Sequence, residues 1–202
     1  MSLNERKTEA IVRSHFESHL DSIVIEEQSS DNPKIRKLLS TASKSGTGLG
    51  YPEFIIQYKN NPDFIVVIEC KADITKHESS TRDKPKDYSV DGVLLCSSYL
   101  SKDFDVLSIA VSGQTKKNYK VSHFLQVKGD RTSVEIFSDK LLSPDDYLDS
   151  YLKSPEKFRQ DYERLIDFSK ELNETLHTLQ VKEDLRAILI SSILISLESK
   201  AF

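Results

Sequence analysis

One short segment, FIVVIECK at residues 64–71, constrains the fold of this chain more than any other. Side chains of a strand alternate between its two faces, and here both faces are apolar until Glu69 and Lys71. A strand that is apolar on both faces is typical of the centre of a sheet that is covered on both sides. The sequence therefore predicts an α/β fold in which a carboxylate and an ammonium end a central strand.

The preceding segment, PEFIIQYK at residues 52–59, predicts a second strand that folds back on the first. Directly opposite residues of an antiparallel pair point to the same face of the sheet. If Glu53 lies opposite Glu69 or Lys71, all three groups meet at one end of the hairpin. A turn of three or five residues gives that register, whereas a four-residue turn needs a bulge to restore it. We predict the register that brings the three groups together.

Periodicity and turn residues predict the remaining elements. We expect helices at 4–20, 33–42 and 90–101, strands at 22–28, 104–113, 119–127 and 133–139, a flexible loop at 43–50 and a mobile surface loop at 73–87. From Ser143 onward the pattern is helical. The sequence therefore predicts an α/β core at 1–140 and a helical extension at 141–202.

Composition argues against several classes of protein. No run of roughly 18 apolar residues is present, so we expect no membrane span, and the N-terminus lacks the apolar centre of a secretion signal. Cys70 and Cys96 form no CxxC pair and suit a reducing compartment. A net charge of -4 argues against a simple nucleic-acid-binding module. We therefore expect a cytoplasmic protein whose DNA contacts are local or supplied by another domain.

The three polar groups of the predicted hairpin indicate a particular chemistry. Two converging carboxylates offer the hard oxygen ligands that Mg²⁺ prefers. A neighbouring ammonium can orient or deprotonate water and stabilise a pentavalent phosphate. Together, Glu53, Glu69 and Lys71 would suit metal-assisted hydrolysis of a phosphodiester. The alternative is a network of ion pairs at the strand end, because buried Glu and Lys side chains need partners.

These residues resemble the motif of the PD-(D/E)xK nucleases. That motif places an acidic residue at the start of one strand and (D/E)-x-K on the next, matched here by Pro52-Glu53 and Glu69-Cys70-Lys71. The resemblance implies a restriction-endonuclease-like core, with a mixed central sheet flanked by helices. It also implies a Mg²⁺ site, with Mn²⁺ as a substitute, built from Glu53, Glu69 and the carbonyl of Cys70. Lys71 would assist the attacking water. The chain departs from the usual pattern because Glu53 replaces an aspartate.

Two further acidic positions bear on this resemblance. Family members often add a glutamate from the first helix, for which Glu9 is the candidate and Glu5 the reserve; an ordinary exposed helix residue is the alternative for Glu9. A literal Pro62-Asp63 also occurs, six residues before Glu69. We interpret it as a chance match, because it would lie about 20 Å away at the far end of the strand.

The wider pattern at 87–113, DYSVDGVLLCSSYLSKDFDVLSIAVSG, resembles the nuclease region at the front of restriction-modification enzymes. Such enzymes include chains fused to an N6-adenine DNA methylase, and the final LISSILISLESKAF resembles the helical connector to that methylase. The resemblance implies an endonuclease domain that cuts double-stranded DNA, with downstream methylase and specificity domains as partners. No N-P-P-Y sequence is present, so we expect this chain to methylate nothing.

Two alternative functions stay open. The chain can be an inactive relative that docks or positions DNA, or a nuclease that cuts RNA or single strands. Basic residues form two clusters: Lys76, Arg82, Lys84 and Lys86 after the site, and Lys116, Lys117 and Lys120 in a later turn. The first cluster either holds DNA phosphates beside the scissile bond or is simply solvated.

Overall fold

The computed structural model of the chain describes residues 4–42, 50–115, 117–136 and 139–198. The chain divides into two compact units, Met1–Lys153 and Ser154–Phe202. We predicted the change of character at 141, but helix α4 (Pro144–Leu152) belongs to the first unit because its Tyr147 and Tyr151 are buried in that core. The loop predicted at 43–50 lies, apart from its last residue, outside the described residues.

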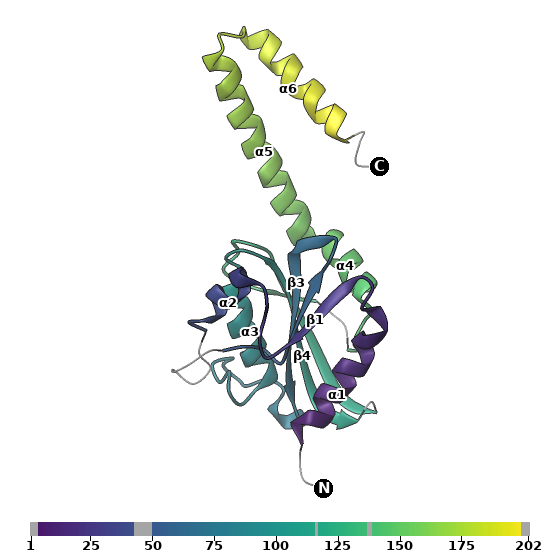
Figure 1. Cartoon of the computed structure of the whole chain (residues 1–202). Coiled ribbons are helices and arrows are strands. Elements are labelled where there is room, and N and C mark those ends of the chain that lie inside the picture. The colour runs from purple at the N-terminus through teal and green to yellow at the C-terminus, as the bar shows by residue number, and fades with distance from the viewer. Residues whose placement is uncertain (1–3, 43–49, 116, 137–138, 199–202) are drawn as a thin grey trace. The chain divides into compact units, whose positions relative to one another are not determined.

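A six-stranded mixed sheet forms the centre of the first unit (Figure 1). The strands lie side by side in chain order: β1 (Ile23–Glu27), β2 (Phe54–Tyr58), β3 (Asn61–Lys71), β4 (Asp105–Thr115), β5 (Asn118–Gln126) and β6 (Val134–Ile136). Strands β3 and β4 run parallel, and the other neighbouring pairs run antiparallel. The prediction of an α/β fold with a mixed central sheet is confirmed.

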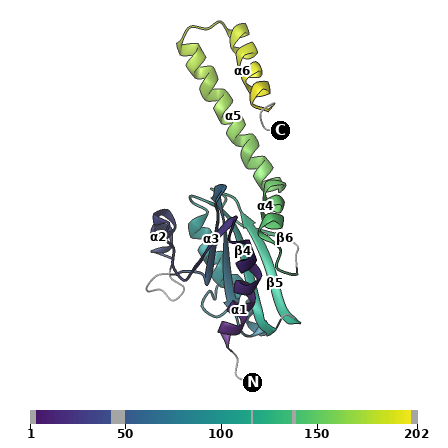
Figure 2. The ribbon, with the colours of Figure 1, turned by 45° about the vertical axis from the view of Figure 1, so that its right-hand side comes forward.

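Helices cover both faces of this sheet (Figure 2). On one face, α1 (Glu5–Phe16) and α4 enclose a core that includes Phe16 and Phe64, and the short helix η1 (Glu17–His19), which has no buried residue, follows α1. On the other face, α2 (Pro33–Leu39) and α3 (Ser89–Leu100) enclose a second core that includes Ile65 and Val67. Burial of apolar side chains on both faces of β3 explains why its sequence is apolar throughout its centre.

The β2–β3 hairpin has the predicted register but reaches it by a different route. Tyr58 pairs with Asn61 across a tight turn, and the next pair is Gln57 with Ile65. One step on β2 therefore corresponds to four steps on β3, and this bulge contains Pro62, which cannot donate a ladder hydrogen bond. From there Phe54 pairs with Ile68. The turn itself has two residues, so the register comes from the bulge and not from a turn of three or five residues.

The parallel pair sets the position of the polar end of β3. Helix α3 connects β3 to β4, so the carboxyl ends of the two strands lie together, with Glu69 opposite Ala110 and Lys71 opposite Ser112. Glu69 shares a sheet face with the core under α3, which contains Ala110 and Val67. The carboxyl ends of parallel strands are a common place for ligand sites in α/β sheets.

The polar segment 73–87, predicted as a mobile loop, is anchored to the body of the unit. After the short helix η2 (Ile74–Lys76), the buried carboxylate of Asp91 accepts hydrogen bonds from the backbone of Ser79 at 3.1 Å and of Lys84 at 2.8 Å, and a short one from the Ser79 hydroxyl. The polarity of the sequence was misleading, because these donors bond to a buried side chain and not to water.

A buried histidine provides a second anchor for the same segment. His77 Nδ1 lies 3.0 Å from the hydroxyl of Ser112 on β4, and Nε2 lies 2.9 Å from the hydroxyl of Ser122 on β5. Burial, with a smaller contribution from the charge of Lys120, lowers the pKa of His77 to about 4. The imidazole is therefore neutral at physiological pH and acts as a structural link between the loop and the sheet.

The second unit consists of the predicted helices, α5 (Pro155–Thr178) and α6 (Glu183–Glu198). Ser154 caps α5 by accepting a hydrogen bond from the backbone of Lys157, and Arg186 donates one to Asn173 at 3.3 Å between the helices. Many apolar side chains of these helices are exposed, among them Phe158, Tyr162, Leu179, Leu185, Ile188 and Ile195. None of the described helices is long and apolar enough to cross a membrane.

Candidate functional site

Glu69 is a charged side chain at the end of β3 with only 1% exposure. Helix α3 passes so close to it that a Cβ at Gly92 would lie 3.2 Å from both Cγ and Cδ of Glu69, and 2.8 Å from the carbonyl oxygen of Pro85. Glycine at this position lets the helix and the preceding loop lie against the carboxylate. The nitrogen of Lys71 lies 3.5 Å from Glu69 Oε1, so the buried charge has an ionic partner.

Lys71 lies between two carboxylates. Its Nζ is 2.7 Å from Glu5 Oε1 on α1, in addition to its contact with Glu69. Burial alone would lower the pKa of Lys71, but the charges of Glu69 and Glu5 outweigh it, and the pKa is raised above its ordinary value. Lys71 is therefore an ammonium in this structure, and it can donate hydrogen bonds and offset negative charge.

Glu53 lies directly before β2 and is half-buried. Since Phe54 pairs with Ile68, the next step of the same register brings Glu53 opposite Glu69. The amide nitrogen of Gln28, the residue after β1, donates a 2.7 Å hydrogen bond to Glu53 Oε2. The charge of Glu53 also contributes to the raised pKa of Lys71, so the predicted trio lies within electrostatic range at one end of the hairpin.

Helix α1 brings two further carboxylates to this end of the sheet. Its buried Thr8 hydroxyl lies 2.7 Å from the carbonyl oxygen of Gly113 and 3.3 Å from that of Lys71, which anchors the helix to the ends of β4 and β3. Glu5 and Glu9 flank this anchor. Burial, followed by the charges of Glu53 and Glu5, raises the pKa of Glu9. The structure thus pairs Glu5 with Lys71 and places Glu9 in the field of Glu53.

The other predicted positions lie as follows. The Cys70 side chain points to the opposite face of the sheet, where burial raises the pKa of its thiol well above the ordinary value. A protonated thiol is a poor metal ligand, so only the carbonyl of Cys70 is a candidate. Asp63, next to Pro62, is exposed in the bulge at the far end of β3 from Lys71. The assignment of Glu53, Glu69, Lys71, Glu9 and the Cys70 carbonyl as functional groups stays a prediction.

A divalent cation such as Mg²⁺ needs oxygen ligands in a defined geometry. Across residues 4–42, 50–115, 117–136 and 139–198, no group of three or more His, Cys, Asp or Glu side chains is arranged to hold a metal ion. However, Mg²⁺ usually keeps several waters and binds proteins through one or two carboxylates. Burial is the main cause of the raised pKa of Glu9, with smaller contributions from the charges of Glu53 and Glu5 and an opposing one from Arg13. The two carboxylates at one end of the hairpin, Glu53 and Glu69, therefore fit a hydrated Mg²⁺ but not a cage of protein ligands.

A hollow of about 180 Å³ lies beside this cluster of charges. It begins at the residue after Lys71, at the carboxyl ends of β3 and β4, and its lining is part polar: Ala72, Asp73, Ile74, Gly113, Gln114, Thr115 and Asn118. The hollow therefore lies next to the candidate site, but Glu53, Glu69 and Lys71 do not line it.

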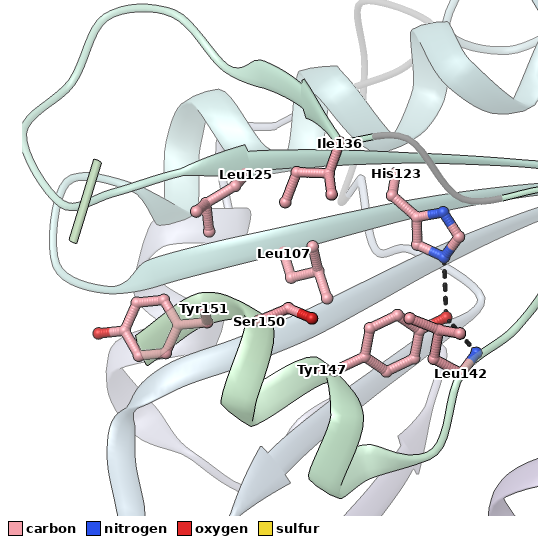
Figure 3. Close-up of a pocket in the computed structure, with 8 residues that line it drawn as sticks. All are labelled: Leu107, His123, Leu125, Ile136, Leu142, Tyr147, Ser150 and Tyr151. Atoms are coloured by element: carbon pink, nitrogen blue, oxygen red, sulfur yellow. Dashed lines mark hydrogen bonds between the residues drawn. The ribbon is translucent and has the colours of Figure 1, made fainter. Parts of the chain in front are cut away.

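A second cavity, of about 70 Å³, lies on the other face of the sheet under α4 (Figure 3). It is lined mainly by apolar side chains, and at one end His123 Nε2 lies 2.8 Å from the hydroxyl of Tyr147, which accepts from the backbone of Leu142 at 2.9 Å. Burial raises the pKa of Tyr147. Among the described residues, no Asp, Glu, Lys or Arg side chain lines this cavity, so this lining does not suit a phosphodiester.

Several residues that shape the site were missed by sequence reasoning. Thr8 and Gln28 form contacts between segments that are far apart in the chain, and no local sequence pattern predicts these contacts. The buried Asp91 looks like an ordinary polar residue near the start of a helix. Gly92 did carry a signal, because an isolated glycine inside a helical pattern often has a packing reason.

Comparison with known proteins gives one relevant similarity. The chain is 25% identical to a protein of Heyndrickxia coagulans, the type II restriction enzyme and methyltransferase RM.BcgI, over 99% of this chain. The matched part spans 34% of the length of that relative. No protein-family model matches the chain, and no solved structure gives a significant match. The similarity therefore relates the chain to a restriction-modification enzyme.

Proposed function

We propose that the first unit is a Mg²⁺-dependent DNA endonuclease domain of a bacterial restriction-modification enzyme. The observation that carries the proposal is the convergence of Glu53, Glu69 and Lys71 at one end of the β2–β3 hairpin. The mixed sheet flanked by helices agrees with a restriction-endonuclease-like core, and the relative that spans the whole chain is a restriction enzyme by name. The reaction is hydrolysis of a phosphodiester in double-stranded DNA.

The groups of the site divide the work of this reaction. Glu53 and Glu69, with the carbonyl of Cys70, would hold the Mg²⁺, which supplies an activated water and polarises the phosphate. Lys71, whose raised pKa keeps it protonated, donates hydrogen bonds to the attacking water or to the phosphate oxygens. Burial of Glu69 strengthens these electrostatic interactions because it excludes water from one side of the site.

The structure separates the basic residues into paired and unpaired groups. Arg82 bonds to Glu78 at 2.5 Å and lies over the ring of Phe124, and Lys76 lies over the ring of Tyr88, so both have structural partners. The other described lysines of the two basic clusters make no hydrogen bond or ion pair with their side chains: Lys84, Lys86, Lys117 and Lys120. Lys116 lies outside the described residues.

These four unpaired lysines are the candidate phosphate contacts. Lys120 pairs with Ser112, which pairs with Lys71, so the three lie in one row across the end of the sheet. Lys84 and Lys86 flank Pro85, whose carbonyl lies against the same glycine as Glu69. The location of Lys84, Lys86 and Lys120 next to the site, despite the net charge of -4, supports local contact with a DNA backbone.

Cleavage of supercoiled plasmid DNA with Mg²⁺ tests the proposal. We expect Glu69→Ala and Lys71→Ala to abolish cleavage while the fold, measured by circular dichroism, survives. Asp63→Ala is the matched control, because it removes an exposed carboxylate that also follows a proline but lies at the other end of β3. Nicking by either site variant at the rate of the parent would refute the assignment. Cleavage of single-stranded DNA or RNA in place of duplex DNA would show that the domain is a nuclease with a different substrate.

A second candidate function is a catalytically inactive module that positions DNA or docks other domains. Two observations favour it. The described residues contain no three-ligand metal group, and the ammonium of Lys71 already forms an ion pair with Glu5, with Nζ 2.7 Å from Oε1. Calorimetry separates the two functions. An inactive module would bind duplex DNA but take up no Mn²⁺, whereas an active site binds the ion and loses it on Glu69→Ala.

The exposed apolar surface of the second unit and the similarity to a longer relative support the proposal that this chain is part of a longer enzyme. Its relative carries a methyltransferase in its name, and the chain spans about a third of that protein. Exposed apolar residues such as Phe158 and Ile188 are poorly suited to water, and contact with further domains would cover them. We propose that methylase and specificity domains are the partners of this unit.

A further inference from the structure

Gln28 donates hydrogen bonds to both the backbone carbonyl and the side-chain carboxylate of Glu53. The backbone N–H of Gln28 donates to the carbonyl oxygen of Glu53 at 3.2 Å, which extends the β1–β2 ladder by one step. The side-chain amide of the same residue donates to Glu53 Oε2 at 2.7 Å. A single residue thus fixes the position of the Glu53 backbone and the direction of its carboxylate.

The backbone conformation of Gln28 is what makes this double contact. Its φ of 52° lies in the left-handed region, which residues other than glycine rarely adopt. The strand β1 ends at Glu27, so the turn in the chain occurs directly at Gln28. Strained residues of this kind cluster at functional sites, where other interactions hold them in place.

We propose that Gln28 is a positioning residue for metal binding: it holds one oxygen of Glu53 so that the other faces the cation. This inference rests on the proposed function of Glu53 as a ligand. The donor is a neutral amide, so it orients the carboxylate without cancelling its charge, unlike Arg13, which forms an ion pair with Glu27 at 2.6 Å nearby. Hydrogen bonds from a second layer of residues tune metal ligands in the same way.

The contact between Gln28 and Glu53 lies outside the hydrophobic core of the fold. Gln28 is exposed, and its side chain reaches Glu53 at the surface of the sheet. Removing the amide therefore takes away an orienting hydrogen bond but little buried area. A positioning role and a purely structural role can thus be separated by measuring metal affinity and thermal stability on the same variants.

The test is isothermal titration calorimetry with Mn²⁺ on the full chain. Gln28→Gly is the main variant, because glycine keeps the left-handed backbone and the N–H but lacks the amide. We expect its Mn²⁺ affinity to fall by about 10- to 100-fold, as for other residues that orient metal ligands, with a melting temperature no lower than the parent's. Gln180→Gly is the matched control, because Gln180 also has a positive φ, of 59°, but belongs to the second unit.

A double-mutant cycle distinguishes this inference from the proposed function. If Gln28 acts through Glu53, then Gln28→Gly adds no further loss of Mn²⁺ affinity in a Glu53→Ala background. Unchanged Mn²⁺ affinity in Gln28→Gly, with a loss in Glu53→Ala, overturns the role of Gln28 and leaves the metal site intact. No Mn²⁺ binding by the parent, or full binding by Glu53→Ala, overturns both.

Discussion

Replacing Gly92 with alanine tests the packing that places Glu69. In an ordinary helix interior, Gly→Ala stabilises a protein by about 1 kcal/mol. Here the added Cβ would lie 2.8 Å from the carbonyl oxygen of Pro85 and 3.2 Å from two carbons of Glu69, whereas ordinary contacts begin near 3.4 Å. The carbonyl cannot retreat alone, because the adjacent Lys84 N–H is bonded to the buried carboxylate of Asp91.

The expected magnitude follows from these contacts. Overpacking a well-filled site costs about 1–3 kcal/mol, and the upper part of that range applies because one neighbour is backbone. After the helix-propensity gain is offset, Gly92→Ala should lower the free energy of unfolding by about 1–2 kcal/mol. The side chain of Glu69 is the part that can move, and a shift of up to about 1 Å at a reacting group costs roughly 100-fold in rate. Mn²⁺ affinity should fall as well.

Urea unfolding followed by circular dichroism measures the stability, since the chain has no tryptophan, and calorimetry measures Mn²⁺ affinity. Gly129→Ala is the matched control. Gly129 has a φ of 89° and nothing within 4 Å of the added Cβ, so that variant should lose stability through backbone strain but keep its Mn²⁺ affinity. If Gly92→Ala is as stable as the parent and binds Mn²⁺ equally well, the described packing of Glu69 is wrong.

Three further predictions concern the loop and the basic residues. Asp91→Ala should destabilise the first unit by about 2–4 kcal/mol, because it leaves buried backbone donors unpaired, and trypsin should then cut after Lys86 faster. The folded pKa of His77 is about 4 against an ordinary 6.5, so its contribution to stability is present above pH 6.5 and is lost as the pH falls toward 4; His77→Gln should lack this part of the pH dependence in urea titrations. Changing the four unpaired lysines to glutamine should weaken duplex binding and reduce the slope of log K against log salt by up to about 4, whereas an unchanged slope would show that they do not contact phosphates.

The central strands and the hairpin register were predictable because buried strands require apolar residues on the faces that they bury. A strand that is apolar on both faces has few places in a fold other than the centre of a sheet, and β3 lies there. The route to the register was not predictable. The two-residue turn and the bulge at Pro62 depend on how a strand accommodates a residue that cannot donate a hydrogen bond, and several turn lengths give the same parity.

The surroundings of the candidate site were harder to predict than its motif. The motif lies on two adjacent strands, so local periodicity places Glu53, Glu69 and Lys71. The choice between Glu5 and Glu9 depends on the rotation of α1, which is set by Thr8 bonding to strand ends more than 60 residues away in sequence. The polar segment before α3 looked mobile because its buried partner, Asp91, is recognisable only in three dimensions.

Crystals of the chain soaked in Mn²⁺ test the central claim most directly, through anomalous diffraction at the manganese edge. The account predicts a peak between the carboxylates of Glu53 and Glu69, within about 2.3 Å of an oxygen of each, and no peak there in crystals of Glu69→Ala. A fully occupied Mn²⁺ elsewhere, or no ion at the end of β3 while Lys71 stays paired with Glu5, would contradict it.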